Sequence, residues 1–471
     1  GETAWGCLTG HFRCGGSSGT VGGKAEIFLD YGNIEGNIYG GGTGSASVVA
    51  GGTLINLDNA GAVVSGGIYG GGRNGAAVQN GTVVNIRNGT AANVYGGGEG
   101  GAVTGGTAVT VAAGRVTGNV YGGGVGASVT GGAVVTIGGG SVGGDVYGGG
   151  TGTGATVNGT TAVGVNAGVV TGSVYGGGGT AAVTGGATVA LGSGAVVSGS
   201  VYGGGSSGGI GGGTKVTLTG ATVHGDVFGG GRDASVASGA VVNISGGGAA
   251  DVYGGGSGTA AAVTGGTQVV IKQSDNITGA VFGGGCDGAE VVGDARVEVD
   301  GGAPGFDIYG GGNTADVTGG ATVVLGWTQL TGNVYGGGLN GNVSGDTLVD
   351  VLIGNSGSWG GLTGNIYGGG FNGVVGGSAA VTLDYSEITG DVYGGGHGSG
   401  AAVLKGTEVT LDNAGTRISG GIYGGGRDGA VVSGGAVVNI LNGSVTDVYG
   451  GGKNSLVEGD TTLTLSGGNI T

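Results

Sequence analysis

The chain has 471 residues, of which 141 are glycine, one is proline and none is methionine, and its net charge at pH 7 is −16. Collagen is excluded because glycine does not recur at every third position and proline is almost absent. Disorder is disfavoured because 38% of the residues are hydrophobic and only 9% are charged. With 13 Lys and Arg against 29 Asp and Glu, we expect no nucleic-acid partner, since such partners need clustered basic residues.

The sequence offers few signals of targeting or of redox state. No stretch approaches the roughly 18 consecutive apolar residues of a membrane span, so we expect none in this segment. The chain opens on Gly1 without a signal peptide and stops within a repeat, so we expect it to be part of a longer chain. Cys7 and Cys14 are close enough in sequence to bridge, which leaves Cys286 alone; both the bridged and the unbridged states remain open.

Residues 1–30 look unlike the rest but are a degenerate first copy of a repeat. A shift of 354 residues places Trp5 to Gly10 on Trp359 to Gly364, and Arg13 on Tyr367. The same shift carries residues 29–98 onto 383–452 without a gap. Thirteen short repeats therefore form a second-order repeat, whose period of 354 residues separates Tyr39 from Tyr393. We expect residues 1–471 to form one continuous domain.

From residue 37 onward, one phrase recurs sixteen times: a polar residue, Val or Ile, an aromatic residue and three glycines. The interval between successive copies ranges from 25 (Phe228 to Tyr253) to 32 (Tyr335 to Tyr367) and is most often 26 (Tyr95 to Tyr121), a period typical of solenoids and repeat arrays. The aromatic residues are Tyr39, Tyr69, Tyr95, Tyr121, Tyr147, Tyr175, Tyr202, Phe228, Tyr253, Phe282, Tyr309, Tyr335, Tyr367, Tyr393, Tyr423 and Tyr449. We call them the aromatic ladder.

The local pattern of one repeat, residues 95–120, predicts short strands separated by glycine corners. β-Branched residues bounded by glycine indicate strands, and helical spacing of apolar residues is absent. The strands expected are 94–95, 102–104 and 107–111, with residues 115–117 leading into the next copy. We expect the glycine triplets and pairs to supply the positive φ values that sharp corners need.

The third strand of each repeat alternates strictly. Val109 and Val111 flank Thr110, and the same apolar pair recurs in the other copies, whereas the residue between them varies. Such alternation turns the pair inward and the variable residue outward. Each repeat is then one coil, and the predicted fold is an all-β β-solenoid, a parallel β-helix of about 17 coils of mostly 26 residues. Propellers fit poorly, because they close at four to eight longer blades.

Length differences between copies fall after the third strand, as in residues 272–278 and 352–362. We expect this arc to be an exposed corner, where insertions are tolerated. Trp5, Trp327 and Trp359 all lie in the arc, where aromatic side chains can stack on sugars.

The aromatic ladder has two interpretations. If the preceding Val or Ile faces the core, the aromatic residue faces outward, and its rings stack into a stripe that can contact glycans or a neighbouring filament. Alternatively, the stacked rings stabilise the coils themselves and are partly buried over the glycine corner. The structural interpretation is favoured, because a feature present in nearly every coil usually serves the stacking.

In most repeats, an Asn or Asp stands two positions before the aromatic residue, and we call these residues the polar corner ladder. It comprises Asn37, Asn93, Asn119, Asp145, Asp226, Asp251, Asp307, Asn333, Asn365, Asp391 and Asp447. Such residues can satisfy backbone groups from coil to coil, which is the favoured interpretation. Calcium is the alternative, but it needs several converging oxygen ligands, and the nine-residue Gly/Asp repeat of calcium-binding rolls is absent. We therefore expect no cofactor or metal.

The sequence holds no catalytic constellation. His11, His224 and His397 are far apart, and the acidic residues are dispersed. Solenoid enzymes that cleave polysaccharides need converging carboxylates or a base beside a cation. We therefore expect a protein that is not an enzyme.

The period Val-Tyr-Gly-Gly-Gly…Val-Thr-Gly-Gly-Thr-x-Val-x-Val covers the whole chain. In this respect it resembles the glycine-rich repeat regions of large bacterial surface and adhesin-like proteins, including autotransporter-type passenger domains. The resemblance implies export and an extracellular or cell-surface role. The function expected is a structural fibre or adhesin shaft that associates with itself, end to end or laterally. The alternative is an adhesin that binds surface glycans through the aromatic ladder or the Trp-bearing arc.

Overall fold

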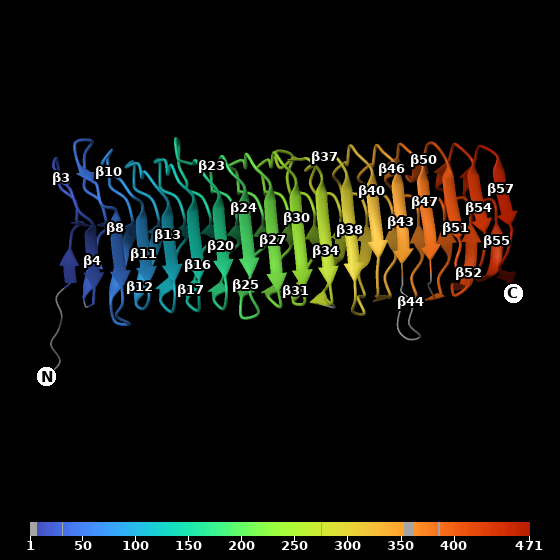
Figure 1. Cartoon of the computed structure of the whole chain (residues 1–471), viewed down its shortest axis with the longest axis horizontal. Helices are drawn as coiled ribbons and strands as arrows, with labels where there is room; N and C mark the ends of the chain where they lie inside the picture. Colours follow the sequence, from blue (N-terminus) through green and yellow to red (C-terminus); the bar gives the residue numbers. More distant parts are fainter. Residues whose placement is uncertain (1–6, 31, 275, 353–360, 385–386) are drawn as a thin grey trace. The chain divides into compact units, whose positions relative to one another are not determined.

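The computed structural model describes residues 7–30, 32–274, 276–352, 361–384 and 387–471. All regular elements of these residues are β-strands, which form a β-solenoid of about 17 parallel coils (Figure 1). The predicted fold class is thereby confirmed. The chain divides into two compact units: unit 1 contains residues 1–225 and 231–237, and unit 2 contains residues 226–230 and 238–471. The expectation of one continuous domain stays a prediction.

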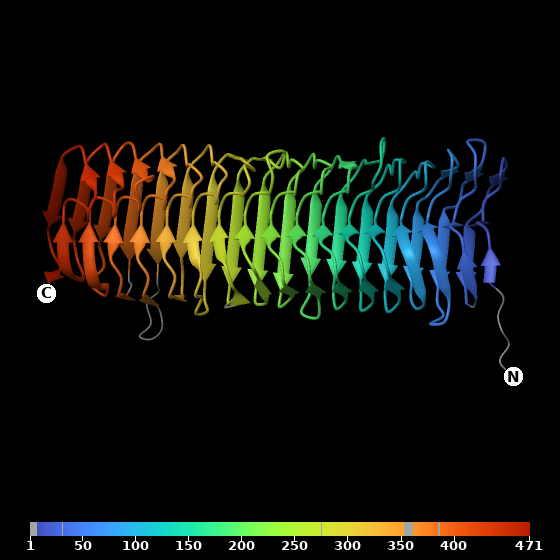
Figure 2. The ribbon, with the colours of Figure 1, turned by 180° about the vertical axis from the view of Figure 1, so that it is seen from behind.

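Each coil uses up to four short strands in a fixed order, named here the arc, aromatic, second and long strands. In one coil of unit 1 they are β14 (Arg115–Val116), β15 (Val120–Tyr121), a single bridging residue at Val129 and β16 (Ala133–Ile137). Within each unit, equivalent strands of successive coils lie side by side (Figures 1 and 2). The repeat of the sequence is therefore one lap of the chain.

The long strands are the most regular element, because five or six alternating residues extend without a glycine corner. In unit 1 they are β4 (Ala25–Leu29), β8 (Thr53–Leu57), β11 (Thr82–Ile86), β13 (Thr107–Val111), β16, β20 (Thr161–Val165), β24 (Ala187–Leu191) and β27 (Thr214–Thr219). In unit 2 they are β30 (Ala240–Ser245), β34 (Thr267–Lys272), β38 (Ala295–Asp300), β40 (Ala321–Leu325), β43 (Thr347–Leu352), β47 (Ala379–Asp384), β51 (Thr407–Leu411), β54 (Ala436–Ile440) and β57 (Thr461–Leu465).

The aromatic strands end on the ladder position. In unit 1 they are β2 (Phe12–Arg13), β6 (Ile38–Tyr39), β9 (Val63–Tyr69), β12 (Thr90–Tyr95), β15, β18 (Val146–Tyr147), β22 (Val174–Tyr175) and β26 (Val201–Tyr202). In unit 2 they are β29 (Val227–Phe228), β32 (Val252–Tyr253), β36 (Ala280–Phe282), β39 (Asp307–Tyr309), β42 (Val334–Tyr335), β45 (Ile366–Tyr367), β49 (Val392–Tyr393), β52 (Arg417–Tyr423) and β55 (Ser444–Tyr449).

The arc and second strands are mostly two residues long, because glycine or a turn interrupts the chain on both sides. The arc strands are β1 (Cys7–Thr9), β5 (Asn33–Glu35), β14, β17 (Ser141–Val142), β21 (Val169–Val170), β25 (Val196–Val197) and β28 (Thr222–Val223) in unit 1, and β31 (Gly248–Ala249), β35 (Asn276–Ile277), β41 (Gln329–Leu330), β44 (Gly361–Leu362), β48 (Glu387–Ile388) and β58 (Asn469–Ile470) in unit 2. The second strands are β3 (Thr20–Val21), β7 (Val48–Val49), β10 (Ala77–Val78), β19 (Thr156–Val157) and β23 (Ala182–Val183) in unit 1, and β33 (Val263–Thr264), β37 (Val291–Val292), β46 (Val374–Val375), β50 (Ala402–Val403), β53 (Val431–Val432) and β56 (Leu456–Val457) in unit 2.

The core of each coil is a short column of branched apolar side chains. In the coil that contains β16, each strand contributes: Val116, Val120, Val129, Val135 and Ile137 all have 0% exposure. Each buried Val or Ile contributes about 1.5–3 kcal/mol relative to an exposed one. The inward orientation predicted for the apolar pairs of the long strands is confirmed.

The head of the chain forms the first described coil, as the second-order repeat predicts. β1 pairs with β5, and β2 pairs with β6 so that Phe12 aligns with Ile38 and Arg13 with Tyr39. Arg13 stands at a ladder position, and its guanidinium lies 5.5 Å from the centroid of the Tyr39 ring. A cation–π contact therefore replaces ring stacking in this coil.

The insertion-prone arc joins a long strand to the next arc strand. In unit 2 it connects β34, which ends at Lys272, to β35, which begins at Asn276. Trp327 lies in such an arc and is 52% exposed. Trp5, Trp359 and most of the expected insertion at 352–362 lie outside the described residues.

The expected role of the glycine triplets is wrong. In the described chain, none of the glycines in the triplets that follow the aromatic ladder has a positive φ. The prediction is confirmed at glycine pairs, for example at Gly105 before a long strand (φ 109°) and at Gly265 (φ 94°). The triplets are needed because adjacent coils approach closely. A Cβ on Gly149, the second residue of its triplet, would lie 2.8 Å from the Cα of Gly178 in the next coil. No side chain fits there.

We predict that Gly149→Ala destabilises the protein by roughly 1–3 kcal/mol, because the added methyl group overpacks two backbones. The measurement is the free energy of unfolding by denaturant. Gly23→Ala is the control: an added Cβ meets nothing within 4 Å, and the φ of Gly23 is not positive. That variant should keep or slightly raise the stability. Equal effects of the two substitutions would contradict the close-approach explanation.

Candidate functional site

The aromatic ladder is a continuous stack of rings within each unit. Unit 1 stacks Tyr39 to Tyr202, and unit 2 stacks Phe228 to Tyr449. Neighbouring ring centroids are 4.6–5.0 Å apart, and the ring planes are inclined by 3–12°. This spacing is close to the separation of paired strands, so strand pairing itself places each ring on the next. The structure thus has the stack on which both interpretations of the ladder rely.

The ladder does not form an exposed stripe, contrary to the orientation expected for an outward aromatic residue. Thirteen of the sixteen rings are at most 9% exposed. Tyr95 and Tyr423 are partly exposed, and Tyr449 is 46% exposed. The Val or Ile before each ring is buried as expected, except Val448, which is partly exposed. Most rings are covered as well. Two sets of polar residues, one on each side of the hydroxyl groups, account for this.

On one side, the polar corner ladder bonds to the phenols. The Nδ2 of Asn119 donates to the Tyr121 hydroxyl at 3.1 Å, and the Tyr147 hydroxyl donates to Oδ2 of Asp145 at 2.9 Å. The corner residue stands two positions before its ring, so both come from the same coil. Asn at one coil and Asp at the next thus reverse the direction of the hydrogen bond.

On the other side, the rings are covered by residues from two coils further along the chain. These covering residues follow the glycine triplets. In unit 2, Arg427 Nη1 donates to the Tyr367 hydroxyl at 3.4 Å, although the two are 60 residues apart. In unit 1, Arg232 Nη1 bonds to the Tyr175 hydroxyl at 3.4 Å, and the Tyr39 hydroxyl bonds to Glu99. The repeat period of the sequence did not indicate this contact, because the two residues lie in coils that are separated by one intervening coil.

The polar corner ladder also bonds the coils to one another. The Oδ1 of Asn119 accepts the backbone N–H of Asp145 at 2.8 Å, and the Oδ1 of Asp145 accepts that of Ser173 at 2.7 Å. The same acceptor role is found at Asn37, Asn93, Asp226, Asp251, Asp307, Asn333, Asn365 and Asp391. Asp447 holds the position in the last described coil. This is the geometry of the structural interpretation. In the described chain, no group of three or more His, Cys, Asp or Glu side chains converges on one point.

A third network was missed by sequence reasoning. Seven buried threonines, each the first residue of a long strand, donate from Oγ1 to a glycine carbonyl at 2.5–2.7 Å: Thr53, Thr82, Thr107, Thr161, Thr267, Thr347 and Thr407. The acceptor is the first glycine of the next triplet, as in Thr107 to Gly122. Alanine fills this position in most other coils, for example Ala133. The Thr/Ala restriction at the strand start was the available signal.

The cysteines and histidines do not converge. Cys14 and Cys286 are free thiols, and the side chain of Cys7 lies outside the described residues. His397 follows the triplet of the next coil, and its ring stacks on that of Tyr367 with the centroids 5.3 Å apart. Burial raises the pKa of the Cys286 thiol to about 12, so the group stays protonated near neutrality. The thiol donates to Oδ2 of Asp287 at 3.4 Å, and with this pKa the contact does not generate a thiolate near neutrality.

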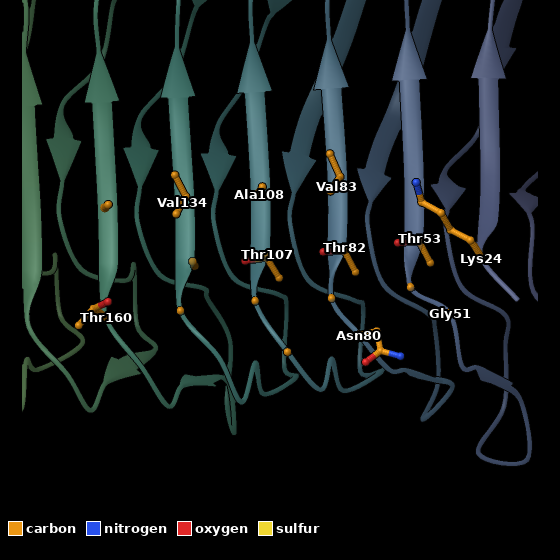
Figure 3. A pocket seen from close by; sticks show the side chains of 17 residues that line it. Lys24, Gly51, Thr53, Asn80, Thr82, Val83, Thr107, Ala108, Val134 and Thr160 are labelled. Atoms are coloured by element: carbon orange, nitrogen blue, oxygen red, sulfur yellow. The ribbon is translucent and has the colours of Figure 1, made fainter.

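A shallow groove follows the corner that precedes the long strands in unit 1. It has a volume of about 590 Å³ and runs across successive coils, along the starts of β8, β11, β13, β16 and β20 (Figure 3). Its lining is glycine, Thr, Ala and Val, with Asn80 at the rim and Lys24 as its one charged side chain. The groove offers surface and shape but no reactive group.

The same groove recurs in unit 2 at the offset of the second-order repeat. It has a volume of about 390 Å³ and includes Thr407 and Val437 where the first groove has Thr53 and Val83. Its lining carries three charged side chains, those of Lys405, Glu408 and Asp460. The two grooves share a backbone but differ in charge.

Charge separates the two units more strongly than the overall net charge suggests. Unit 1 contains eight acidic and seven basic residues, a net charge of −1, whereas unit 2 contains 21 acidic and six basic residues, a net charge of −15. Residues 116–214 contain a single charged residue, Asp145. The surface of these coils is therefore almost free of charge, which is unusual for a protein in water.

No protein-family model, no curated protein and no solved structure matches this chain. Among the residues described, none belongs to a helix long and apolar enough to cross a membrane.

The buried phenols predict alkaline unfolding. Burial, with smaller contributions from the Tyr121 phenol and the Glu99 carboxylate, raises the pKa of Tyr95 to about 12, against about 10 in an unfolded chain. The protonated phenol is thus favoured by folding, so its stabilisation is complete below pH 10 and is lost as the pH rises towards 12. Burial also raises the pKa values of Tyr147 and Tyr335.

We expect tyrosinate absorbance to appear together with the loss of β-sheet circular dichroism. Tyr95→Phe removes one shifted group, so it should weaken the loss of stability between pH 10 and pH 12. Complete tyrosinate formation near pH 10 with the sheet intact would contradict buried rings.

Substitutions of Asn119 separate the two bonds of the corner ladder. Asn119→Ala leaves the backbone N–H of Asp145 without its acceptor, so we expect a loss of about 1–3 kcal/mol in the free energy of unfolding. Asn119→Asp keeps the Oδ1 acceptor and can accept from the Tyr121 hydroxyl, as Asp145 does from Tyr147. It should retain most of the stability. Equal losses in the free energy of unfolding for Asn119→Asp and Asn119→Ala, measured by denaturant titration near neutral pH, would contradict this role of the Oδ1 acceptor.

Proposed function

We propose that this protein is a structural, extracellular β-solenoid that serves as a fibre or adhesin shaft and associates with itself. One observation carries the proposal: the aromatic ladder, the polar corner ladder and the buried threonines each connect one coil to the next. The rings stack on rings, the corner oxygens accept the next coil's N–H, and the buried threonines bind the next glycine carbonyl. These bonds serve stacking and recur along the chain.

A stack of this kind suits a role that depends on length. In repeat proteins each unit contacts only its neighbours, so stability and size grow by adding units. The resemblance to glycine-rich repeat regions of bacterial surface proteins supports an extracellular location. The acidic net charge of −16 supports solubility of a long assembly.

The last described coil exposes side chains at positions that the coil before it buries. Leu463 and Leu465 on β57 are 49% and 57% exposed, whereas Val438 and Ile440 at the same positions one coil earlier are 0% exposed. A further coil placed on this end, from the same chain or from another copy, would bury both leucines and pair the open edge of β57.

The alternative is an adhesin that binds surface glycans. Burial of the aromatic ladder weakens one form of this alternative, because covered rings offer no stacking face. The exposed Trp327 keeps the other form open, since an indole can stack on a sugar. A glycan array probed with the protein and with Trp327→Ala separates the two functions: loss of specific binding in the variant would favour the adhesin.

Removal of one whole coil tests the structural role. Deletion of residues 283–309 joins Phe282 to Gly310, where another triplet begins, and keeps every strand in phase. We expect this variant to fold and to form the same assemblies in electron microscopy and sedimentation, because the neighbouring coils are equivalent. Deletion of residues 283–295, about half a coil, is the matched control and should abolish folding.

Two outcomes contradict the proposal. The intact chain could remain monomeric at all concentrations, or the in-phase deletion could fold yet lose assembly. The second result would place the function in one coil rather than in the stack.

A further inference from the structure

A row of small apolar side chains points outward from the long strands of unit 1. The second residue of each strand contributes: Leu54, Val83, Ala108, Val134 and Ala162, on β8, β11, β13, β16 and β20. Val83 is 36% exposed and Val134 47% exposed. Figure 3 shows Val83, Ala108 and Val134 on successive strands beside the groove. We call this row the outer apolar row.

Beyond Leu54, the outer apolar row alternates in size from coil to coil. Val83, Ala108, Val134 and Ala162 follow one another as large, small, large and small. Ala108 leaves a recess between Val83 and Val134, and Ala162 leaves one between Val134 and Thr188. The groove includes both alanines in its lining. Alternating large and small residues allow two facing layers to interdigitate.

This pattern is complementary to itself in one orientation. A two-fold axis that is perpendicular to the solenoid axis and passes between the Ala108 and Val134 coils makes two such faces antiparallel. Val134 of one copy then lies opposite Ala108 of the other, and Val83 opposite Ala162. A two-fold interface uses the same patch on both copies, so a self-complementary pattern is what it needs. A parallel arrangement would instead place Val134 on Val134.

The distribution of charged residues favours association through the same surface. The outer apolar row and the next outward row, which contains Asn85, Thr110 and Thr136, carry no charge. Two copies of unit 1 can approach at little electrostatic cost, whereas a net charge of −15 makes two copies of unit 2 repel each other. The equivalent groove in unit 2 carries Lys405, Glu408 and Asp460, which would lose their hydration in a dry sheet-to-sheet contact.

We propose that two copies of this chain associate laterally through the outer apolar row of unit 1, face to face and antiparallel, with Val134 seated opposite Ala108. The inference rests on the proposed function and specifies which surface makes its lateral contact. Sheets that pack face to face in this way lie about 10 Å apart. The groove is filled by the partner's valines, and no other ligand is required.

A charge placed in the row tests the surface. Ala108→Lys puts an ammonium group in the recess opposite Val134 and should weaken self-association by about tenfold or more. Ala380→Lys is the matched control: it changes the same residue type at the same outward position on β47 of unit 2. It should leave association within about twofold of the unmodified chain. Sedimentation velocity over a range of concentrations measures both, and circular dichroism checks folding.

Cross-linking tests the register. In a chain whose three native cysteines are replaced by serine, Val83→Cys is mixed with Ala162→Cys and treated with a short bis-maleimide. The antiparallel pair places Val83 opposite Ala162 but offsets like positions by three coils, roughly 14 Å along the axis, so it predicts an abundant mixed dimer and little cross-linking of either variant alone. Cross-linking of Val83→Cys mainly to itself would overturn the antiparallel register.

The outcomes separate the inference from the proposed function. If the unmodified chain assembles and Ala108→Lys assembles equally well, the lateral surface is wrong and the fibre proposal stands. If the chain does not assemble at all, the proposed function fails and the inference falls with it. If only end-to-end fibres persist in Ala108→Lys while bundles are lost, both are supported. Retention of an uncharged polysaccharide by unit 1, abolished by Ala108→Lys without any change in self-association, would assign the groove to a glycan and overturn the inference.

Discussion

The spacing of parallel strand pairing governs this structure. Every residue of a coil has an equivalent about 4.8 Å above and below it, so each side chain must tolerate a near copy of itself at that distance. Flat rings satisfy the condition by stacking, as in Tyr121 and Tyr147 at 4.7 Å. Corner Asn and Asp satisfy it by accepting the next coil's N–H. The middle glycines of the triplets satisfy it by having no side chain, because a Cβ on Gly149 would meet the backbone of Gly178. Stacked carboxylates satisfy it least well: burial raises the pKa of Asp226, the N–H of Asp251 lowers it, and the negative charge of Asp251 raises it to a smaller extent.

The fold could be predicted from the sequence because its signals are local and periodic. The alternation of Val109, Thr110 and Val111 fixes the inward face, and the second-order repeat places Arg13 at a ladder position without any knowledge of the structure. The surroundings of the ladder could not be predicted in this way. Arg427 covers Tyr367 from 60 residues away, a contact between a coil and its second neighbour that a comparison of adjacent repeats does not contain. The glycine triplets misled for a related reason, because glycine is equally suited to a positive φ and to a close approach.

The two grooves show that a shared backbone does not determine the chemistry of the surface. The two grooves lie at the same corner of equivalent coils, yet one is bordered by Val83, Ala108 and Val134 and the other by Lys405, Glu408 and Asp460. Outward positions of the long strands are free to vary, since they do not contribute to the core. The second-order repeat therefore keeps the architecture constant while the surface chemistry diverges, and net charges of −1 and −15 in the two units express that freedom.

The pairing of each coil only with its neighbours also gives the fold a mechanical direction. A force that pulls on the chain from one end peels off a single lap at a time, breaking its short strands in sequence. A force that separates two adjacent coils along the stacking axis instead loads all the strand pairs between them at once, together with the stacked rings and the corner hydrogen bonds. The force needed to separate two coils therefore depends on how many strand pairs share the load. The energy absorbed before failure depends on how many coils can separate one after another.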